Sequence, residues 1–343
     1  MIIRRFPLSL VCVAAAIILG LTLPLGVASG GLNIPAETIV SVLLGSDLGA
    51  FFSLEPASKP MTKIIIDLRL PRMILASIVG GGLAIVGVLL QTATRNDLAD
   101  PFLFGLSSGA AAGAVLVITF TGDFLGIWTL PIAAFVGGLV SALTVLALVT
   151  RTLHTGPERL VLAGLAVSFL FTAIANYFVF AGDQRAAHSV VFWSLGGLGL
   201  ARWETIGFAV LGLSMLISFC SLKRHQLDAL LSGDDTAHSL GINPKRMRIE
   251  IFIVCAFATG LFVSLVGVIG FVGLMVPHLA RAFVGPLHGA LLIVCGLFGA
   301  VLVVSSDIFS RLILAPQELP IGIITAAVGA VFVIFLVIRK RSA

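Results

Sequence analysis

The chain has 343 residues, of which 59% are hydrophobic and 11% are charged, and its mean hydropathy is +1.15. This composition excludes a soluble domain and predicts an all-α, polytopic transmembrane protein. The net charge of +5 fits orientation against anionic lipid and gives no reason to expect a nucleic-acid partner.

Apolar runs long enough to cross a bilayer, roughly 17 to 22 residues each, recur along the chain. They occupy residues 6–27, 73–90, 102–120, 130–149, 160–180, 206–222, 251–269, 290–308 and 321–338. A shorter run at 271–284 contains Pro277, which predicts a broken or tilted helix whose freed carbonyl needs a protein partner. We therefore expect about ten transmembrane helices in a single transmembrane domain over residues 1–343.

An even number of spans places both termini on the same side of the membrane. Lys and Arg near the ends of spans are retained in the cytoplasm. With the amino terminus inside, about two thirds of the 21 Lys and Arg residues fall in cytoplasmic segments. Both termini are therefore predicted to be cytoplasmic, and a cleaved signal at the first span is not favoured because its removal would spoil this asymmetry.

The first long polar segment, residues 30–72, is predicted to be an outer loop. It carries the breakers Pro35, Pro56, Pro60 and Pro71. Arg69 and Arg72 stand at its end, in the expected first turn of the next span. There they either snorkel to lipid headgroups or present a positive rim to an acidic partner.

Glycine dominates the next two spans and predicts close helix packing. Gly80, Gly81, Gly82 and Gly87 lie in one span, and Gly105, Gly109 and Gly113 recur in the other. The polar turn between them, residues 91–100, lies at the predicted cytoplasmic mouth. Thr92, Asn96 and Leu98 are residues of this region that suit the narrowing of a pore.

The second long polar segment, residues 223–248, lies inside and is predicted to hold a short amphipathic helix. Ser232 or Asp234 can cap it, and Gly241 followed by Pro244 ends it. One interpretation is a helix that lies on the lipid surface. Against it, the acidic pair Asp234 and Asp235 would be repelled by an anionic leaflet.

Five ordered motifs complete the pattern. RLPR and RNDLADP flank the first glycine-rich span, and GDDTAHSLG holds the short helix. GVIGFVGLMVPHLAR follows at residues 267–281. The last motif combines Asp307, Arg311, Glu318, Pro320 and Gly322. Together these motifs resemble the FecCD family, the permease subunits of ABC importers for ferric siderophores, haem and cobalamin. Asp97 departs from the family pattern, which usually has proline there.

The resemblance implies a type II ABC importer in the bacterial inner membrane. Its expected partners are two copies of an ATPase subunit, a periplasmic binding protein, a second permease copy or paralogue, and membrane lipid. It implies that Arg69, Arg72 and Arg311 dock the binding protein, although Arg311 also suits an intrahelical pair with Asp307. It assigns ATPase coupling to Gly233, Asp234, Ala237, Leu240 and Gly241. It places Thr92, Asn96 and Leu98 in an inner gate beside the loop at 151–159.

The residues themselves also favour an externally powered permease. A phosphate-binding GxxxxGK[ST] loop is absent from the sequence, and the predicted spans hold no Lys or Glu of the kind that drives a secondary transporter. A secondary transporter or channel is the alternative from another class. We expect no catalytic residue, metal site or cofactor, because the cysteines lie singly and His278 has no second ligand nearby.

The expected cargo is a bulky chelate with its metal already saturated, since the spans are apolar with scattered Ser, Thr and Asn. A ferric siderophore is favoured, and haem and cobalamin are the alternatives within the family.

Overall fold

The computed structural model describes residues 6–31, 34–51, 57–151 and 157–340, which form helices and no strand. The helices are α1 Leu8–Ala28, α2 Ala36–Phe51, α3 Lys59–Lys63, α4 Leu70–Thr94, α5 Leu106–Leu116, α6 Thr129–Thr150, α7 Pro157–Ala181, α8 Ala187–Ser194, α9 Trp203–Ser232, α10 Asp234–Ser239, α11 Pro244–Val266, α12 Val272–Val284, α13 His288–Leu312 and α14 Ile321–Lys340.

Over these described residues, eight helical stretches are long and apolar enough to span a membrane, and two shorter apolar helices, 106–121 and 272–284, accompany them. These ten stretches coincide with the ten predicted runs. The all-α membrane fold is therefore confirmed. Helix α12 has only 13 residues and contains Pro277, so it covers part of the membrane thickness, as the short run had indicated.

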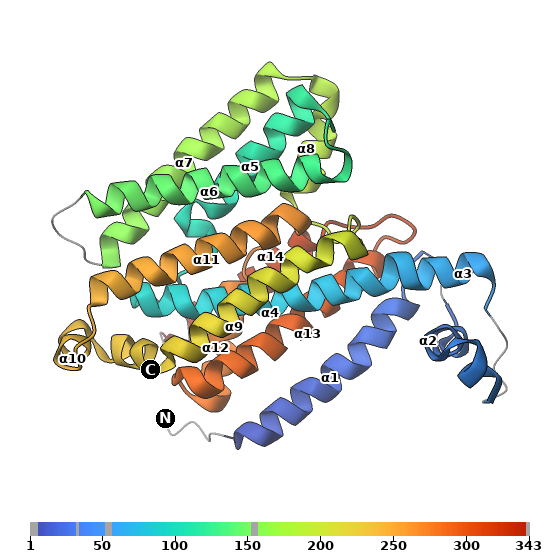
Figure 1. Ribbon diagram of the computed structural model, residues 1–343, viewed down its shortest axis with the longest axis horizontal. Coiled ribbons are helices and arrows are strands. Elements are labelled where there is room, and N and C mark those ends of the chain that lie inside the picture. The colour runs from blue at the N-terminus through green and yellow to red at the C-terminus, as the bar shows by residue number, and fades with distance from the viewer. Residues whose placement is uncertain (1–5, 32–33, 52–56, 152–156, 341–343) are drawn as a thin grey trace.

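The helices are arranged in two layers (Figure 1). Helices α5, α6, α7 and α8 form one layer, and α11 packs against both α6 and α9 to join it to the rest. Helix α4 runs through the middle of the larger layer, where it contacts α9, α11, α12 and α13. We call the end of the molecule that carries α10 the α10 end, and the opposite end, where α3 lies, the α3 end.

Glycine explains why α4 lies at the centre. Every residue from Val79 to Thr94 is buried. A Cβ atom on Gly80 would overlap the carbonyl of Gly299 in α13, and one on Gly87 would overlap the carbonyl of Gly273 in α12. Backbones of neighbouring helices approach this closely only where side chains are missing. The predicted role of glycine in packing is therefore confirmed for this span.

The prediction of a loop over residues 30–72 is wrong for most of the segment. Helix α2 occupies part of it, and a continuous helical stretch begins at Lys59 and runs through α4, while 32–33 and 52–56 lie outside the described residues. Pro60 stands at the start of a helix, where its missing N–H is not needed. The wide π-helical turn at 64–69 precedes Pro71 and relieves the clash of its ring with the preceding turn.

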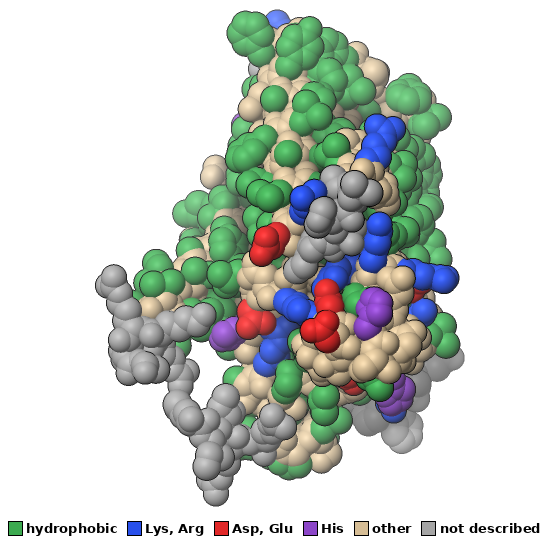
Figure 2. Space-filling model, turned by 90° about the vertical axis from the view of Figure 1, so that its left-hand side faces the viewer, with side chains coloured by type: hydrophobic (Ala, Val, Ile, Leu, Met, Phe, Trp, Pro, Cys, Tyr) green, Lys and Arg blue, Asp and Glu red, His purple; other side chains and the backbone are tan. Residues whose placement is uncertain are grey.

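Charged side chains gather on the α10 end, whereas apolar side chains cover the flanks of the same view (Figure 2). The beginning of α1 and the end of α14 lie toward this end as well (Figure 1). An apolar belt between polar ends is what a membrane-spanning bundle requires.

Candidate functional site

Helix α10 is the short helix predicted in the polar segment 223–248. It spans Asp234–Ser239 between two glycines in left-handed or related conformations, Gly233 at φ +130° and Gly241 at φ +75°. Neither Ser232 nor Asp234 caps it through a side chain, so that detail of the prediction is wrong. Ala237 has no exposed surface, whereas the side chain of Leu240 is 64% exposed. Ala237 therefore packs inward, and Leu240 faces outward from the α10 end.

Asp234 binds two arginines instead of capping its helix. Its carboxylate accepts hydrogen bonds from Nη1 and Nη2 of Arg248 at 3.0 and 2.6 Å, and it also pairs with Arg95. The hydrogen bonds from Arg248 hold the pKa of the Asp234 carboxyl below its usual value, and the charges of Arg248 and Arg95 act in the same direction. Sequence reasoning missed both arginines, because no spacing rule links positions on three different elements.

The three residues predicted to form an inner gate lie in different environments. Asn96 and Leu98 are exposed in the turn after α4, where Asn96 Oδ1 accepts a hydrogen bond from the Leu98 N–H at 3.0 Å. Thr92 is buried, and its hydroxyl lies 2.8 Å from His288 Nε2. On its other side His288 Nδ1 lies 2.7 Å from Asp228 Oδ1. Most of the neighbouring loop at 151–159 lies outside the described residues.

Gln91 joins the end of α4 to α12. Its Nε2 donates to the carbonyls of Ala99 at 3.3 Å and of Gly273 at 3.1 Å. Gly273 stands four residues before Pro277, so its carbonyl is the one that the missing N–H of Pro277 leaves without a helical partner. The sequence-based requirement for a protein group that satisfies this freed carbonyl is confirmed.

Asp100 forms the start of the short 3₁₀ helix Pro101–Phe104. Its Oδ1 accepts a hydrogen bond from the Phe102 N–H at 3.0 Å. The side chain is 6% exposed, and this burial raises the pKa of the Asp100 carboxyl to about 6, although the hydrogen bond from Phe102 acts in the opposite direction.

This raised pKa predicts that Asp100 makes the protein less stable as the pH rises. The folded protein holds the proton more tightly than the unfolded chain, so the destabilisation is absent below about pH 4 and grows to at most about 3 kcal/mol above about pH 6. Asp100→Asn keeps the acceptor for Phe102 but does not titrate. The difference in Tm between this variant and the natural protein, measured in detergent from pH 4 to 7, should therefore increase with pH. Parallel Tm curves would contradict the prediction.

At the α3 end, two of the predicted docking residues lie inside the protein. Arg69 is 9% and Arg311 is 3% exposed. Arg69 Nη1 donates to the carbonyls of Val27 and Ala28 at 2.6 and 2.8 Å. Arg311 donates to those of Gly26 and Ser29 at 2.9 and 2.5 Å. The expectation that these arginines project as an outer rim is not met, because both cap the carbonyl end of α1.

Arg72 connects this buried cluster to the surface. Its guanidinium pairs with Asp307 at 2.9 Å and with Glu318 at 2.8 Å. Asp307 has no exposed surface, whereas the Glu318 side chain is 47% exposed. Asp307 also pairs with Arg311 at 2.9 Å, which confirms the intrahelical pair considered from the sequence. The carboxylate of Asp307 is thus balanced by two cations in a region of low dielectric.

A cavity of about 960 Å³ lies at the α3 end. Its wall combines the connection between α5 and α6, one side of α8, the connection between α8 and α9, and the end of α11. It is mainly apolar, with Phe192 and Trp193 beside Asp123, His188 and Arg202. The glycines in both connections widen it, since a Cβ added to Gly122, Gly126, Gly197 or Gly199 would meet only open space.

All three tryptophans of the chain lie near this cavity. Trp128 precedes α6, Trp193 lies in α8, and Trp203 begins α9. Tryptophan is enriched at the boundary between a bilayer and water. The cavity therefore lies close to one membrane surface.

The chain is similar to known transport proteins along nearly its whole length. A model of the FecCD transport family matches residues 16–339. The hemin transport system permease protein of Yersinia pestis is 36% identical over 82% of this chain and 85% of its own length. The cobalamin import system permease protein of Halobacterium salinarum is 37% identical over 98% of this chain and 90% of its own.

The fold has a close counterpart among solved structures. A metal-chelate type ABC transporter in an inward-facing conformation superposes with a TM-score of 0.82 at 27% identity. The superposition covers 96% of this chain and 98% of the other.

Proposed function

Since the chain belongs to the FecCD transport family and is the permease of an ABC importer, we propose that its cargo is a ferric siderophore, which crosses the membrane as an intact chelate. The cavity of about 960 Å³ carries this proposal. Its size and its mainly apolar wall suit a bulky complex with a saturated metal, and they do not suit a bare ion that needs several oxygen or nitrogen ligands. Haem and cobalamin are the alternatives.

We assign the α10 end to the cytoplasm of a bacterial cell and the α3 end to the outer side of its inner membrane. The concentration of Lys and Arg at the α10 end supports this orientation. ATP is hydrolysed by two separate subunits that dock on the exposed side of α10. A second permease copy or a paralogue completes the pathway, and the loops after α4 narrow it at Asn96 and Leu98.

A soluble binding protein delivers the chelate at the α3 end. Arg72 reaches that surface through Glu318, while Arg69 and Arg311 support the docking surface from inside by holding the end of α1. In this arrangement the three arginines act together, and Arg72 is the one that contacts the binding protein at the surface. Charge complementarity at such a rim mainly accelerates association.

Reconstitution of the permease with its ATPase subunit and binding protein tests the cargo. We expect that binding protein loaded with a ferric siderophore stimulates ATP hydrolysis and uptake into vesicles, because the proposed cargo is delivered to the mainly apolar cavity on its binding protein. Haem and cobalamin, each on its own binding protein, should not. Stimulation by haem or cobalamin alone would replace the proposed cargo.

The same vesicles decide between an ABC permease and a secondary transporter. Uptake should stop when the ATPase subunit carries an inactivating substitution. Uptake that continues at an unchanged rate would favour the secondary transporter.

A further inference from the structure

Helix α10 has little apolar contact with the rest of the protein. It has six residues, and Ala237 is the only one of them that is buried. So short a helix contributes little stability of its own. Beyond the chain connections to α9 and α11, its position therefore depends on polar bonds, and Asp234 makes two of them, to Arg248 and Arg95.

Arg248 connects α10 directly to α4. It lies in the first turns of α11 and is 6% exposed. Its Nη1 and Nη2 bind the carboxylate of Asp234, and its Nε donates to the carbonyl of Ala93 at 2.8 Å. Ala93 stands one residue before the end of α4, so this carbonyl is one of those that a helix leaves without an internal partner. One rigid guanidinium plane thus holds two elements at once.

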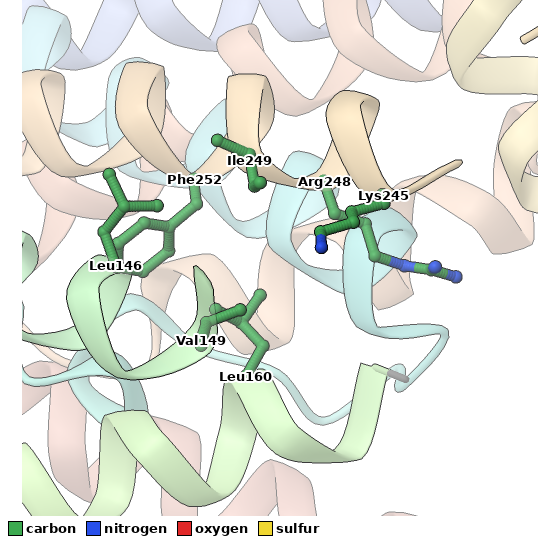
Figure 3. Close-up of a pocket in the computed structure, with 7 residues that line it drawn as sticks. All are labelled: Leu146, Val149, Leu160, Lys245, Arg248, Ile249 and Phe252. Atoms are coloured by element: carbon green, nitrogen blue, oxygen red, sulfur yellow. The ribbon is translucent and has the colours of Figure 1, made fainter. Parts of the chain in front are cut away.

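The surroundings of Arg248 keep that plane in place. The stem of the side chain borders a small cavity lined by Leu146, Val149 and Phe252, and the guanidinium turns away from these apolar residues (Figure 3). An arginine with an apolar stem and a head held by three hydrogen bonds has few other conformations to adopt.

Arg95 makes a second connection between the same two elements. It caps the carboxyl end of α4, directly after Thr94, at φ +50°, and its guanidinium pairs with Asp234. A left-handed conformation is unfavourable for an arginine. The ion pair with Asp234 helps to hold this conformation, and the turn with Asn96 and Leu98 starts at that point.

We propose that Arg248, assisted by Arg95, is the positioning residue that carries a displacement of α10 to the end of α4 and hence to the turn at residues 95–100. The inference rests on the proposed function, in which an ATPase subunit moves α10. Asp234 is the point of attachment, and the bidentate pair transmits translation and rotation because two parallel hydrogen bonds fix direction as well as distance.

Arg248→Lys tests this role, because lysine keeps the charge but has no planar fork with which to hold Asp234 and the Ala93 carbonyl together. In vesicles with the ATPase subunit and loaded binding protein, we expect unchanged binding of the ATPase subunit and continued ATP hydrolysis. Uptake per ATP hydrolysed should fall about tenfold, an effect that corresponds to a coupling free energy of typical size. Arg246→Lys is the matched control, since Arg246 lies two residues away and pairs with Glu250 on its own helix.

The ratio of uptake to hydrolysis separates transmission from folding. An unchanged ratio for Arg248→Lys, or an equal loss for Arg246→Lys, would overturn the inference. If Arg248→Lys fails to bind the ATPase subunit, Asp234→Asn decides, because a neutral amide has one acceptor oxygen and cannot form the bidentate ion pair, while Arg248 keeps its bond to Ala93. The same fall in the ratio supports the inference, and a normal ratio overturns it. A natural protein without ATP-dependent uptake would instead refute the proposed function.

Discussion

Leu240→Asp is expected to abolish ATP-driven uptake while leaving the permease folded. Leu240 is 64% exposed just beyond α10, at the point where we propose that the ATPase subunit docks. Docking would move the carboxylate of the new aspartate from water into a buried contact, where it would have no partner. This cost opposes docking. The affinity for the ATPase subunit should fall at least about tenfold, the equivalent of about 1.4 kcal/mol, as measured by co-purification and by titration in detergent.

Leu125→Asp is the control for this experiment. Leu125 is also exposed, at 51%, but it lies in the connection between α5 and α6 at the α3 end. Its aspartate variant should bind the ATPase subunit normally. Normal ATPase binding by Leu240→Asp would show that the exposed side of α10 is not the docking surface.

Arg311→Ala should cause the largest loss of stability of any single substitution considered. It removes two hydrogen bonds to the carbonyl end of α1 and leaves the buried Asp307 with Arg72 alone. Breaking a buried ion pair by removing one partner costs about 3 to 5 kcal/mol. We expect a correspondingly lower Tm in detergent, and faster proteolysis after α1, because the carbonyl end of α1 loses its hydrogen bonds to α13.

Arg185→Ala is the matched comparison for Arg311→Ala, since Arg185 is exposed in the turn before α8. It should leave the Tm unchanged. If Arg311→Ala instead kept its Tm and lost affinity for the binding protein, Arg311 would be a docking residue and its capping role would be secondary.

The sequence predicted the helices more reliably than their ends. Ten apolar runs correspond to ten helical stretches because hydrophobic length is a property of each segment alone. The prolines of residues 30–72 misled the prediction, since a proline both ends one helix and begins another. Pro60 begins a helix and Pro71 lies inside a continuous helical stretch.

The candidate sites were predictable only in part, for a related reason. Family motifs identify Asp234 and Arg311, but they do not show what these residues touch. Arg248 meets Asp234 across 14 residues, and Arg311 meets Ser29 across 282. Such contacts are set by how helices pack, and a single sequence contains no periodicity that encodes them.

The bond between Gln91 and the carbonyl of Gly273 has a consequence for the evolution of this protein. Pro277 makes that carbonyl available, and the amide of Gln91 satisfies it. Without the amide of Gln91 this carbonyl would lose its hydrogen-bond donor in a helix interior that water does not reach. A lineage that replaces the proline relieves selection on the glutamine, whereas a lineage that loses the glutamine first carries a buried, unbonded carbonyl until the proline also changes. Gln91 and Pro277 should therefore be inherited as a pair. In lineages that lose both, Pro277 should be replaced before Gln91.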